Sequence, residues 1–237
     1  MNCLVYPTRV MKVTQNYRQG NHLNHYKGTP RDYPMDEAGA DAGRDWFYCP
    51  CDKMRIKKLY GVGGKGVNTL WLESVGEVDM PCGKAVVTIM VEHVEDEDLK
   101  KLAVGQEFVR GQKMFREGKD GAVGNHFHLS VGTGRIKGSG WEQNDLGAWV
   151  LSVEGKTLPP EFAFYLGATT VRDSAGLSFP LLPKEEITLD NIPDGYAEKA
   201  VKWAKENGIL RGDDKGDLKL HEPITRQDAV VMMYRMK

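Results

Sequence analysis

Short apolar runs recur over residues 1 to about 180, and several of them alternate apolar with polar side chains. Examples are NTLWLESV, KAVVTIMVEHV, NHFHLSVG and GAWVLSVEG, and glycine-rich segments such as GVGGKG and GTGRIKGSG lie between or beside them. Alternation with a period of two is typical of strands, and glycine clusters are typical of turns. This part of the chain is therefore predicted to be β-rich, with one short helix at EDEDLKKL.

The end of the chain follows a helical pattern instead. YAEKAVKWAKENGIL repeats small and apolar residues at helical spacing and ends in Asn207-Gly208, which is a helix stop signal. TRQDAVVMMYRM predicts a second helix with Thr225 as its N-cap. The proline-containing segment GLSFPLLPKEE precedes both helices. We therefore expect a β-rich domain over 1–180, a linker over 181–187 and a small α-helical module over 188–237.

Composition and charge argue against nucleic acid and membranes as the main binding partners. The 237 residues include 32 basic and 33 acidic side chains, so the net charge of -1 creates no overall field for nucleic acid or an anionic membrane. No apolar run reaches the length of a membrane span. The first residues lack the pattern of a secretory signal peptide, so synthesis in a cytoplasm without export by a classical signal is expected.

Two further motifs favour structural interpretations. Cys49-Pro-Cys51 is too closely spaced for a zinc knuckle, and buried, inert thiols are favoured over a disulfide or a redox role. In GVGGKG, Lys65 is followed by glycine and then by a strand, whereas a phosphate-binding P-loop needs Ser or Thr and then a helix. A turn between two strands is predicted there.

A histidine pair in NHFHLSVG is the first candidate for chemistry. His126 and His128 are two positions apart on a predicted strand, so both side chains lie on one face while Phe127 takes the other. A catalytic zinc commonly takes three ligands from His, Asp and Glu, so other segments must complete such a site. The remaining histidines are His22, His25, His93 and His221.

Five segments carry polar positions in a recognisable order: HYKGTPRDYPMD, GVNTLWLE, IMVEHV, AVGQEFVRGQ and NHFHLSV. Over roughly residues 13 to 132 the chain resembles the lysostaphin and LytM-like zinc endopeptidases of bacterial cell walls. This resemblance implies a narrow cleft floored by antiparallel strands and one zinc ion per chain. It also implies that His25, Asp36 and His128 bind the metal.

The spacing between the first two of these ligands leaves alternatives. The His-to-Asp gap exceeds the one usual in the family, so His22 and Asp32 also qualify. We favour His25 and Asp36, because YPMD stands where the family has an aromatic-x-x-Asp strand. Val91 stands where the family has an aromatic residue.

The resemblance also implies roles for the two histidines outside the ligand set. Either His126 or His93 is expected to take the proton of a metal-activated water, while the other hydrogen-bonds the developing oxyanion. After Gly132 the resemblance fades, and an additional hairpin carrying Trp141 and Trp149 is expected, with packing favoured over contact with a glycan.

The tail IPDGYAEKAVKWAKENGILRGDDKGDLKLHEPITRQDAVVMMYRM is similar to one S-layer homology repeat. This resemblance implies binding of a cell-wall polysaccharide, with Arg226 and Trp203 as contacts. Such repeats usually occur in threes, so one copy is expected to bind weakly, to form a homo-oligomer or merely to pack. His221 is expected at the surface.

Together these expectations describe a peptidoglycan hydrolase of the phage or prophage endolysin type. It would cut peptide stems or cross-bridges, with its α-helical module bound to the wall. These resemblances imply synthesis in a bacterial cytoplasm and action at the cell wall after release. Two alternatives stay open: a catalytically inactive relative that binds the wall, and an N-acetylmuramoyl-L-alanine amidase.

Overall fold

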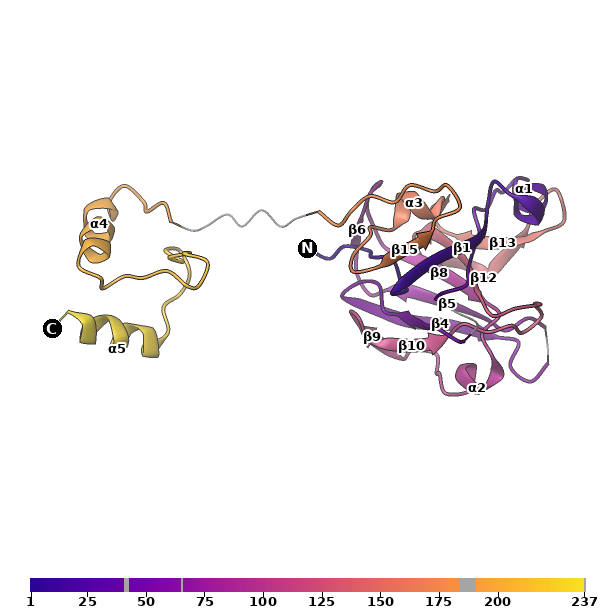
Figure 1. Ribbon diagram of the computed structural model, residues 1–237, viewed down its shortest axis with the longest axis horizontal. Coiled ribbons are helices and arrows are strands. Elements are labelled where there is room, and N and C mark those ends of the chain that lie inside the picture. The colour runs from indigo at the N-terminus through magenta and orange to yellow at the C-terminus, as the bar shows by residue number, and fades with distance from the viewer. Residues whose placement is uncertain (41–42, 65, 184–190, 237) are drawn as a thin grey trace. The chain divides into compact units, whose positions relative to one another are not determined.

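The strands predicted from alternating apolar and polar residues form a nine-stranded sheet in the first part of the chain (Figure 1). The computed structural model describes residues 1–40, 43–64, 66–183 and 191–236. The chain divides into two units, residues 1–183 and 184–237. Residues 184–187 of the expected linker lie outside the described residues.

The strands of the first unit follow the predicted apolar runs, with shorter strands between them. They are β1 (Val10–Asn16), β2 (Met35–Glu37), β3 (Trp46–Tyr48), β4 (Lys53–Tyr60), β5 (Thr69–Ser74), β6 (Val78–Met80), β7 (Gly83–Ala85), β8 (Val87–Glu92), β9 (Glu107–Val109), β10 (Lys113–Arg116), β11 (Phe127–Thr133), β12 (Ile136–Gln143), β13 (Trp149–Val153), β14 (Thr157–Leu158) and β15 (Thr170–Asp173). The helices of this unit are α1 (Gly20–Tyr26), α2 (Asp96–Leu99) and α3 (Pro160–Ala163).

The main sheet is antiparallel except at one edge. Its order is β15-β1-β2-β11-β8-β5-β4-β9, with β14 added beside β11. Only the β1–β15 pair of this sheet is parallel among the described strands. The expected hairpin after Gly132 is present, because β12 pairs antiparallel with β13. The β-rich fold with antiparallel sheets and a small helical C-terminal part is thereby confirmed.

The two faces of the central strands pack against different partners. Leu70 and Leu72 of β5 belong to the main core, whereas Trp71 between them packs with Leu151 of β13 on the opposite face. Every residue of β5 is buried as a result. The hairpin β12–β13 therefore covers part of the second face of the sheet, and the rest of that face remains available for a site.

The glycine-rich segment and the Cys-Pro-Cys motif have the structures that the sequence predicts. Gly61, Gly63 and Gly64 adopt φ of 96°, 80° and 85° in the connection from β4 to β5, so this glycine-rich segment is a turn between strands. Cys49 and Cys51 are buried free thiols.

The second unit contains two helices, α4 (Glu198–Glu206) and α5 (Arg226–Arg235). Asn207 caps the end of α4 and Gly208 has a φ of 69°, as the stop signal predicts. The Thr225 hydroxyl accepts a hydrogen bond from the backbone N–H of Asp228, which makes it the N-cap of α5. Among the described helices none could serve as a membrane span, and the longest, α5, has ten residues.

Candidate metal centre and cleft

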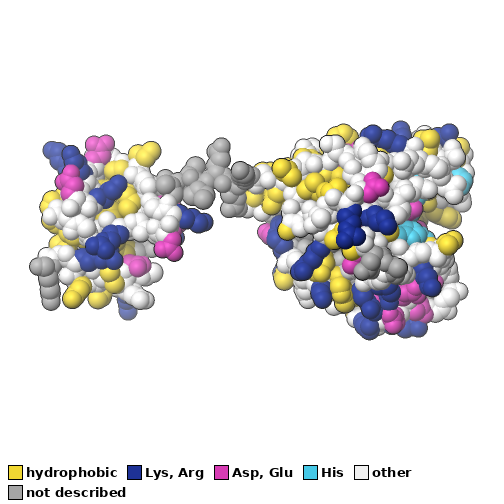
Figure 2. Space-filling view, viewed as in Figure 1, with side chains coloured by type: hydrophobic (Ala, Val, Ile, Leu, Met, Phe, Trp, Pro, Cys, Tyr) yellow, Lys and Arg dark blue, Asp and Glu magenta, His cyan; other side chains and the backbone are white. Residues whose placement is uncertain are grey.

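A row of polar side chains crosses the face of the sheet that the core does not occupy. It runs over β2, β11, β8, β5 and β4 and consists, in this order, of Asp36, His128, Glu92, Thr69 and Tyr60. Residues directly opposite one another on neighbouring strands point to the same face. The antiparallel register therefore aligns carboxylates, an imidazole and hydroxyl groups in one line. In the space-filling view, histidine side chains are visible in a recess of this unit (Figure 2).

The helix α1 brings a further imidazole to this row. His22 is 5% exposed, and its ring packs edge-on against that of His128 with the centroids 4.9 Å apart. His25, three residues later on the same helix, is exposed and lines the neighbouring cavity. The structure thus places His22, and not His25, beside Asp36.

Three side chains offer one ligand atom each within 4.8 Å of one another: His22, Asp36 and His128. The two oxygens of Asp36 lie 3.4 Å from His22 Nε2 and 3.0 Å from His128 Nδ1. Ligand atoms around a tetrahedral zinc with bonds of about 2.1 Å are roughly 3.4 Å apart. The spacing and the two-His, one-carboxylate composition both fit a zinc ion.

Asp32, the alternative carboxylate, has a different role. It is 1% exposed and accepts hydrogen bonds from the Ser130 hydroxyl and the backbone N–H of Leu151, at 2.9 and 3.1 Å. Burial raises its pKa. These contacts join β11 to β13, so Asp32 stabilises the position of the hairpin beside the candidate metal centre.

In the metal-free protein, the contact between Asp36 and His128 favours the charged form of both side chains. Although burial alone would raise the pKa of Asp36, hydrogen bonds from His128 and His22 hold it well below its usual range. Burial alone would lower the pKa of His128, but the hydrogen bond to Asp36 and the charge of Glu92 raise it to about 9. A positively charged ion between these groups would replace the proton of His128.

Two more imidazoles, those of His93 and His126, adjoin the same group. Their ring centroids are 4.6 Å apart, and His126 Nε2 lies 3.7 Å from Asp36. His93 Nδ1 donates to the carbonyl oxygen of Asp120 at 2.7 Å, and His126 Nδ1 donates to that of Gly124 at 2.8 Å. Because a carbonyl only accepts, Nε2 of each neutral ring holds the lone pair and can take a proton.

His93 is held in an uncommon backbone conformation, with a φ of 71°. Burial lowers the pKa of its imidazole, and the neighbouring His128 and His126 lower it further. A neutral ring suits a base. Non-glycine residues in the left-handed region are uncommon and cluster at functional sites.

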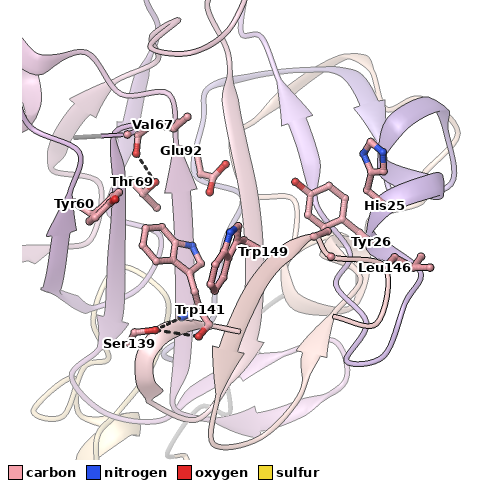
Figure 3. Close-up of a pocket in the computed structure, with 13 residues that line it drawn as sticks. His25, Tyr26, Tyr60, Val67, Thr69, Glu92, Ser139, Trp141, Leu146 and Trp149 are labelled. Carbon is pink, nitrogen blue, oxygen red and sulfur yellow. Dashed lines mark hydrogen bonds between the residues drawn. The ribbon is translucent and has the colours of Figure 1, made fainter. Parts of the chain in front are cut away.

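A cavity of about 800 Å³ opens along the part of the row formed by Glu92, Thr69 and Tyr60 (Figure 3). Its wall includes four aromatic side chains, Tyr26, Tyr60, Trp141 and Trp149. Trp141 also packs on Trp71, with ring centroids 4.5 Å apart, so it combines packing with a place in the wall. The described wall residues further include Glu92, which the sequence analysis did not single out. Its position directly before His93, at the end of an apolar strand, is the signal that could have revealed it.

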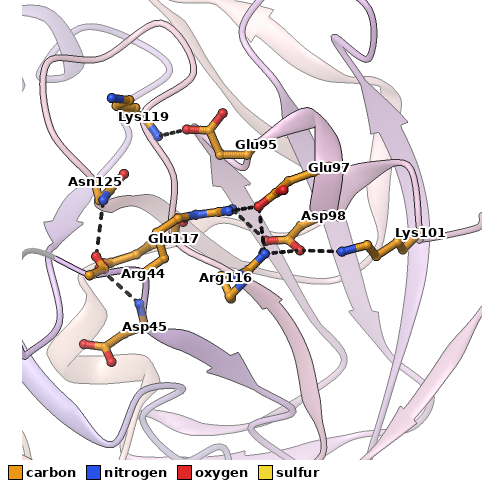
Figure 4. A network of polar contacts seen from close by, with 11 residues as sticks. Arg44, Asp45, Glu95, Glu97, Asp98, Lys101, Arg116, Glu117, Lys119 and Asn125 are labelled. Carbon is orange, nitrogen blue, oxygen red and sulfur yellow. Dashed lines mark hydrogen bonds and ion pairs between the residues drawn. The ribbon is translucent and has the colours of Figure 1, made fainter.

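A network of ion pairs supports the loop that carries His126 (Figure 4). Asp98 of α2 is 5% exposed at its side chain and receives Arg44 at 2.6 Å and Arg116 at 3.0 Å. Arg44 also donates to the carbonyl oxygen of Glu117 at 2.7 Å. Glu117 precedes Gly118, whose backbone bridges to His126. The network therefore ties α2 and β10 to the edge of the site.

The two predicted wall-binding residues lie in the second unit. Arg226 is the first residue of α5 and is exposed, and Trp203 on α4 is 52% exposed. His221 is exposed as well, with Nε2 3.5 Å from Asp194. All three residues are accessible from solvent.

Comparisons with known proteins give one family match and one structural similarity. Residues 188–230 match the S-layer homology domain. The chain is also similar to a zinc-containing peptidase from Vibrio cholerae, with a TM-score of 0.35 and 16% identity. That alignment covers 56% of this chain and 37% of the peptidase. Among curated proteins no match was found.

We predict that His22→Ala weakens zinc binding by more than about a hundredfold, because loss of a ligand exceeds the effect known for residues that only support ligands. His25→Ala is the matched control on the same helix and should leave the affinity unchanged. Competition with a zinc-binding dye measures both. Loss of affinity in His25→Ala alone would restore the assignment favoured by the sequence.

We predict that Asp98→Asn lowers the free energy of unfolding by about 3 kcal/mol, because it leaves Arg44 and Arg116 short of a buried partner charge. The control Glu107→Gln removes an exposed carboxylate that pairs with Arg55 and Lys53, and should cost less than about 1 kcal/mol. Urea titrations of the full-length proteins compare them. Equal losses would contradict a special role for the buried network.

The ion pairs of Asp98 with Arg44 and Arg116 also predict that the free energy of unfolding depends on pH. Burial alone would raise the pKa of Asp98, but Arg116 and Arg44 hold it below its usual value of 3.8. The stabilisation is therefore present above about pH 4 and is lost as the pH falls below it. The stability difference between the protein and Asp98→Asn should shrink in that range.

Proposed function

We propose that the first unit is a zinc-dependent peptidase that cleaves the peptide part of peptidoglycan, and that the second unit binds the protein to the cell wall. The observation that carries the proposal is the group of His22, Asp36 and His128, with two further imidazoles beside it and a cavity along the same row. The sequence resemblance to cell-wall zinc endopeptidases supports the choice of substrate.

In this proposal His22, Asp36 and His128 hold the metal. A bound zinc ion supplies a Lewis acid that lowers the pKa of water toward neutrality and polarises a carbonyl group. The residues of the chain perform the proton transfers. His126 accepts a proton from the attacking water at Nε2, because its Nδ1 is fixed as a donor to the carbonyl of Gly124.

The second free imidazole has a complementary task. His93 is oriented by its hydrogen bond to Asp120, and its ring contacts that of His126. When Nε2 has taken up a proton from solvent, the ring can donate a hydrogen bond to the oxyanion that forms on the substrate. The two rings can exchange these roles, since each keeps Nδ1 on a backbone carbonyl.

The second unit contributes binding rather than chemistry. The S-layer homology match over 188–230 supports recognition of a cell-wall polysaccharide, with Arg226 and Trp203 as accessible contacts. α5 also leaves Val230, Met233 and Tyr234 more than half exposed. These apolar side chains could pack against a second copy of the protein. Formation of a homo-oligomer, one of the outcomes expected for a single repeat, stays a prediction.

We extend the proposal to a lysis enzyme of the phage or prophage endolysin type. This part depends on the sequence resemblance alone. Lysis of living cells from outside and from within, compared in one host, tests it separately from the chemistry.

We predict that the protein with zinc releases new amino and carboxyl ends from purified cell wall, which mass spectrometry identifies. His126→Ala should keep zinc but lose roughly two to four orders of magnitude in rate, the usual contribution of general acid–base catalysis. His128→Ala should lose both zinc and activity.

Three outcomes contradict this assignment. Release of peptides from the muramic acid would indicate an amidase. Binding to wall without any cleavage would indicate an inactive relative. Equal loss of zinc in both variants would show that the base and the ligand within the pair are wrongly assigned.

We predict that removing residues 184–237 leaves cleavage of a small soluble peptide unchanged but lowers activity on wall by about ten- to a hundredfold at low enzyme concentration. Binding to the polymer raises the effective concentration of the enzyme there, and the truncated protein loses this gain. Excess enzyme should restore the rate. Equal loss on both substrates would mean that the second unit is part of the catalytic fold.

A further inference from the structure

We propose that Glu92 binds a primary ammonium group of the substrate inside the cavity, so that the enzyme selects peptides with a free amine near the bond to be cut. This inference rests on the peptidase function proposed above and adds a substrate class to it. The ammonium could be the amino terminus of a peptide or the side chain of a diamino acid.

The first observation is a carboxylate whose oxygens accept no hydrogen bond. Glu92 is half-buried, and among the described residues its side chain makes no hydrogen bond or ion pair, although its charge raises the pKa of the neighbouring His128. Other shielded carboxylates of this unit differ: Glu73 pairs with Arg135 at 3.1 Å, and Glu161 pairs with Arg18 at 3.0 Å. Since a shielded carboxylate without a hydrogen-bond donor is unfavourable, Glu92 is suited to receive a cationic donor from outside the chain.

The second observation is the wall around it. Figure 3 shows Glu92 between Thr69 on one side and Tyr26 on the other, above the two tryptophans. Among the described residues that line the cavity, Glu92 is the one carboxylate, and none is Lys or Arg. The charge of the described wall therefore favours a cationic group over an anionic one.

The aromatic side chains add to this preference. The faces of tryptophan and tyrosine rings attract cations. The ring of Trp141 already holds a cation of the chain, because Lys58 Nζ lies 4.9 Å from its centroid and 4.6 Å from that of Trp71, so Trp149 is the tryptophan left for a ligand. Trp149 is 59% exposed and can contact a ligand in the cavity directly.

The register places this group at a useful distance from the candidate metal centre. Glu92 is one strand from His128 and two strands from Asp36. Neighbouring strands are about 4.8 Å apart, and an extended peptide spans about 3.4 Å per residue. An ammonium at Glu92 therefore belongs to a residue one or two positions from the scissile bond.

A metal ion is the competing occupant. Glu92, His93 and His128 also offer ligand atoms within 4.8 Å of one another. Nδ1 of His128 contacts Asp36 and Nδ1 of His93 donates to the carbonyl oxygen of Asp120, which leaves Nε2 of each ring for such a metal. The aromatic side chains beside Glu92 favour an organic cation instead, and the zinc content of Glu92→Gln distinguishes the two occupants.

Binding of small amines to the full-length, zinc-loaded protein tests the proposal. The probes are Nα-acetyl-lysine methylamide, which carries a side-chain ammonium, and alanine methylamide, which carries an α-ammonium. Their fully acetylated forms are the neutral controls. Tryptophan fluorescence reports binding, since Trp141 and Trp149 line the cavity. The probe that binds more tightly identifies the source of the ammonium.

We expect at least one amine to bind, and Glu92→Gln to weaken it about tenfold or more, as loss of a charge-assisted hydrogen bond does. Glu77→Gln makes the same chemical change at an exposed residue outside the cavity wall and should have no effect. Equal binding of amines and acetylated forms, no binding of either amine, or loss of a second zinc in Glu92→Gln would each overturn the proposal.

Digestion of purified cell wall distinguishes failure of the ammonium site from failure of the proposed peptidase function. If Glu92→Gln cuts wall as well as the unaltered protein, and amines do not bind, the ammonium site fails while the peptidase stands. If amines bind at Glu92 but wall is never cut, the peptidase fails while the ammonium site stands.

Discussion

The pairing register of β2, β11 and β8 is the constraint on which the candidate site depends. Asp36, His128 and Glu92 meet because each lies directly opposite the next. Since successive side chains of a strand point to opposite faces, a slip of one residue would send the imidazole into the core and bring Phe127 or Leu129 to the cleft. The apolar residues that alternate with the histidines therefore fix the site as firmly as its own contacts do.

Burial on both sides of the central strands enforces that register. Leu70 and Leu72 belong to the main core, while Trp71 packs beneath the hairpin β12–β13. A slip of one residue would move Trp71 into the main core and a leucine beneath the hairpin, so the packing on both faces would be lost. The hairpin thus contributes both to the stability of the sheet and to the wall of the cavity.

The sequence predicted the strands, the turn at Gly61 and the caps of the last two helices, because each depends on local periodicity or on residues with special backbone preferences. It also placed His126 and His128 on one face. It did not predict which histidine of α1 faces Asp36. That choice depends on the rotational phase of a helix of seven residues, which has too few positions to show an apolar stripe. The sequence analysis did not single out Glu92, because its place in the site depends on pairing with Thr69 and His128. These two residues are distant in sequence but adjacent in the sheet.

The parallel pairing of β1 with β15 has a consequence for synthesis of the protein. The strand that leads into α1, and so into His22, completes its pairing only with residues 170–173 near the end of the same unit. Contacts this distant in sequence form late, because the intervening chain must be ordered first. A nascent or prematurely terminated chain would leave β1 as an open edge, prone to aggregation. A centre assembled in this way would remain latent on the ribosome and mature only after the whole first unit has been released.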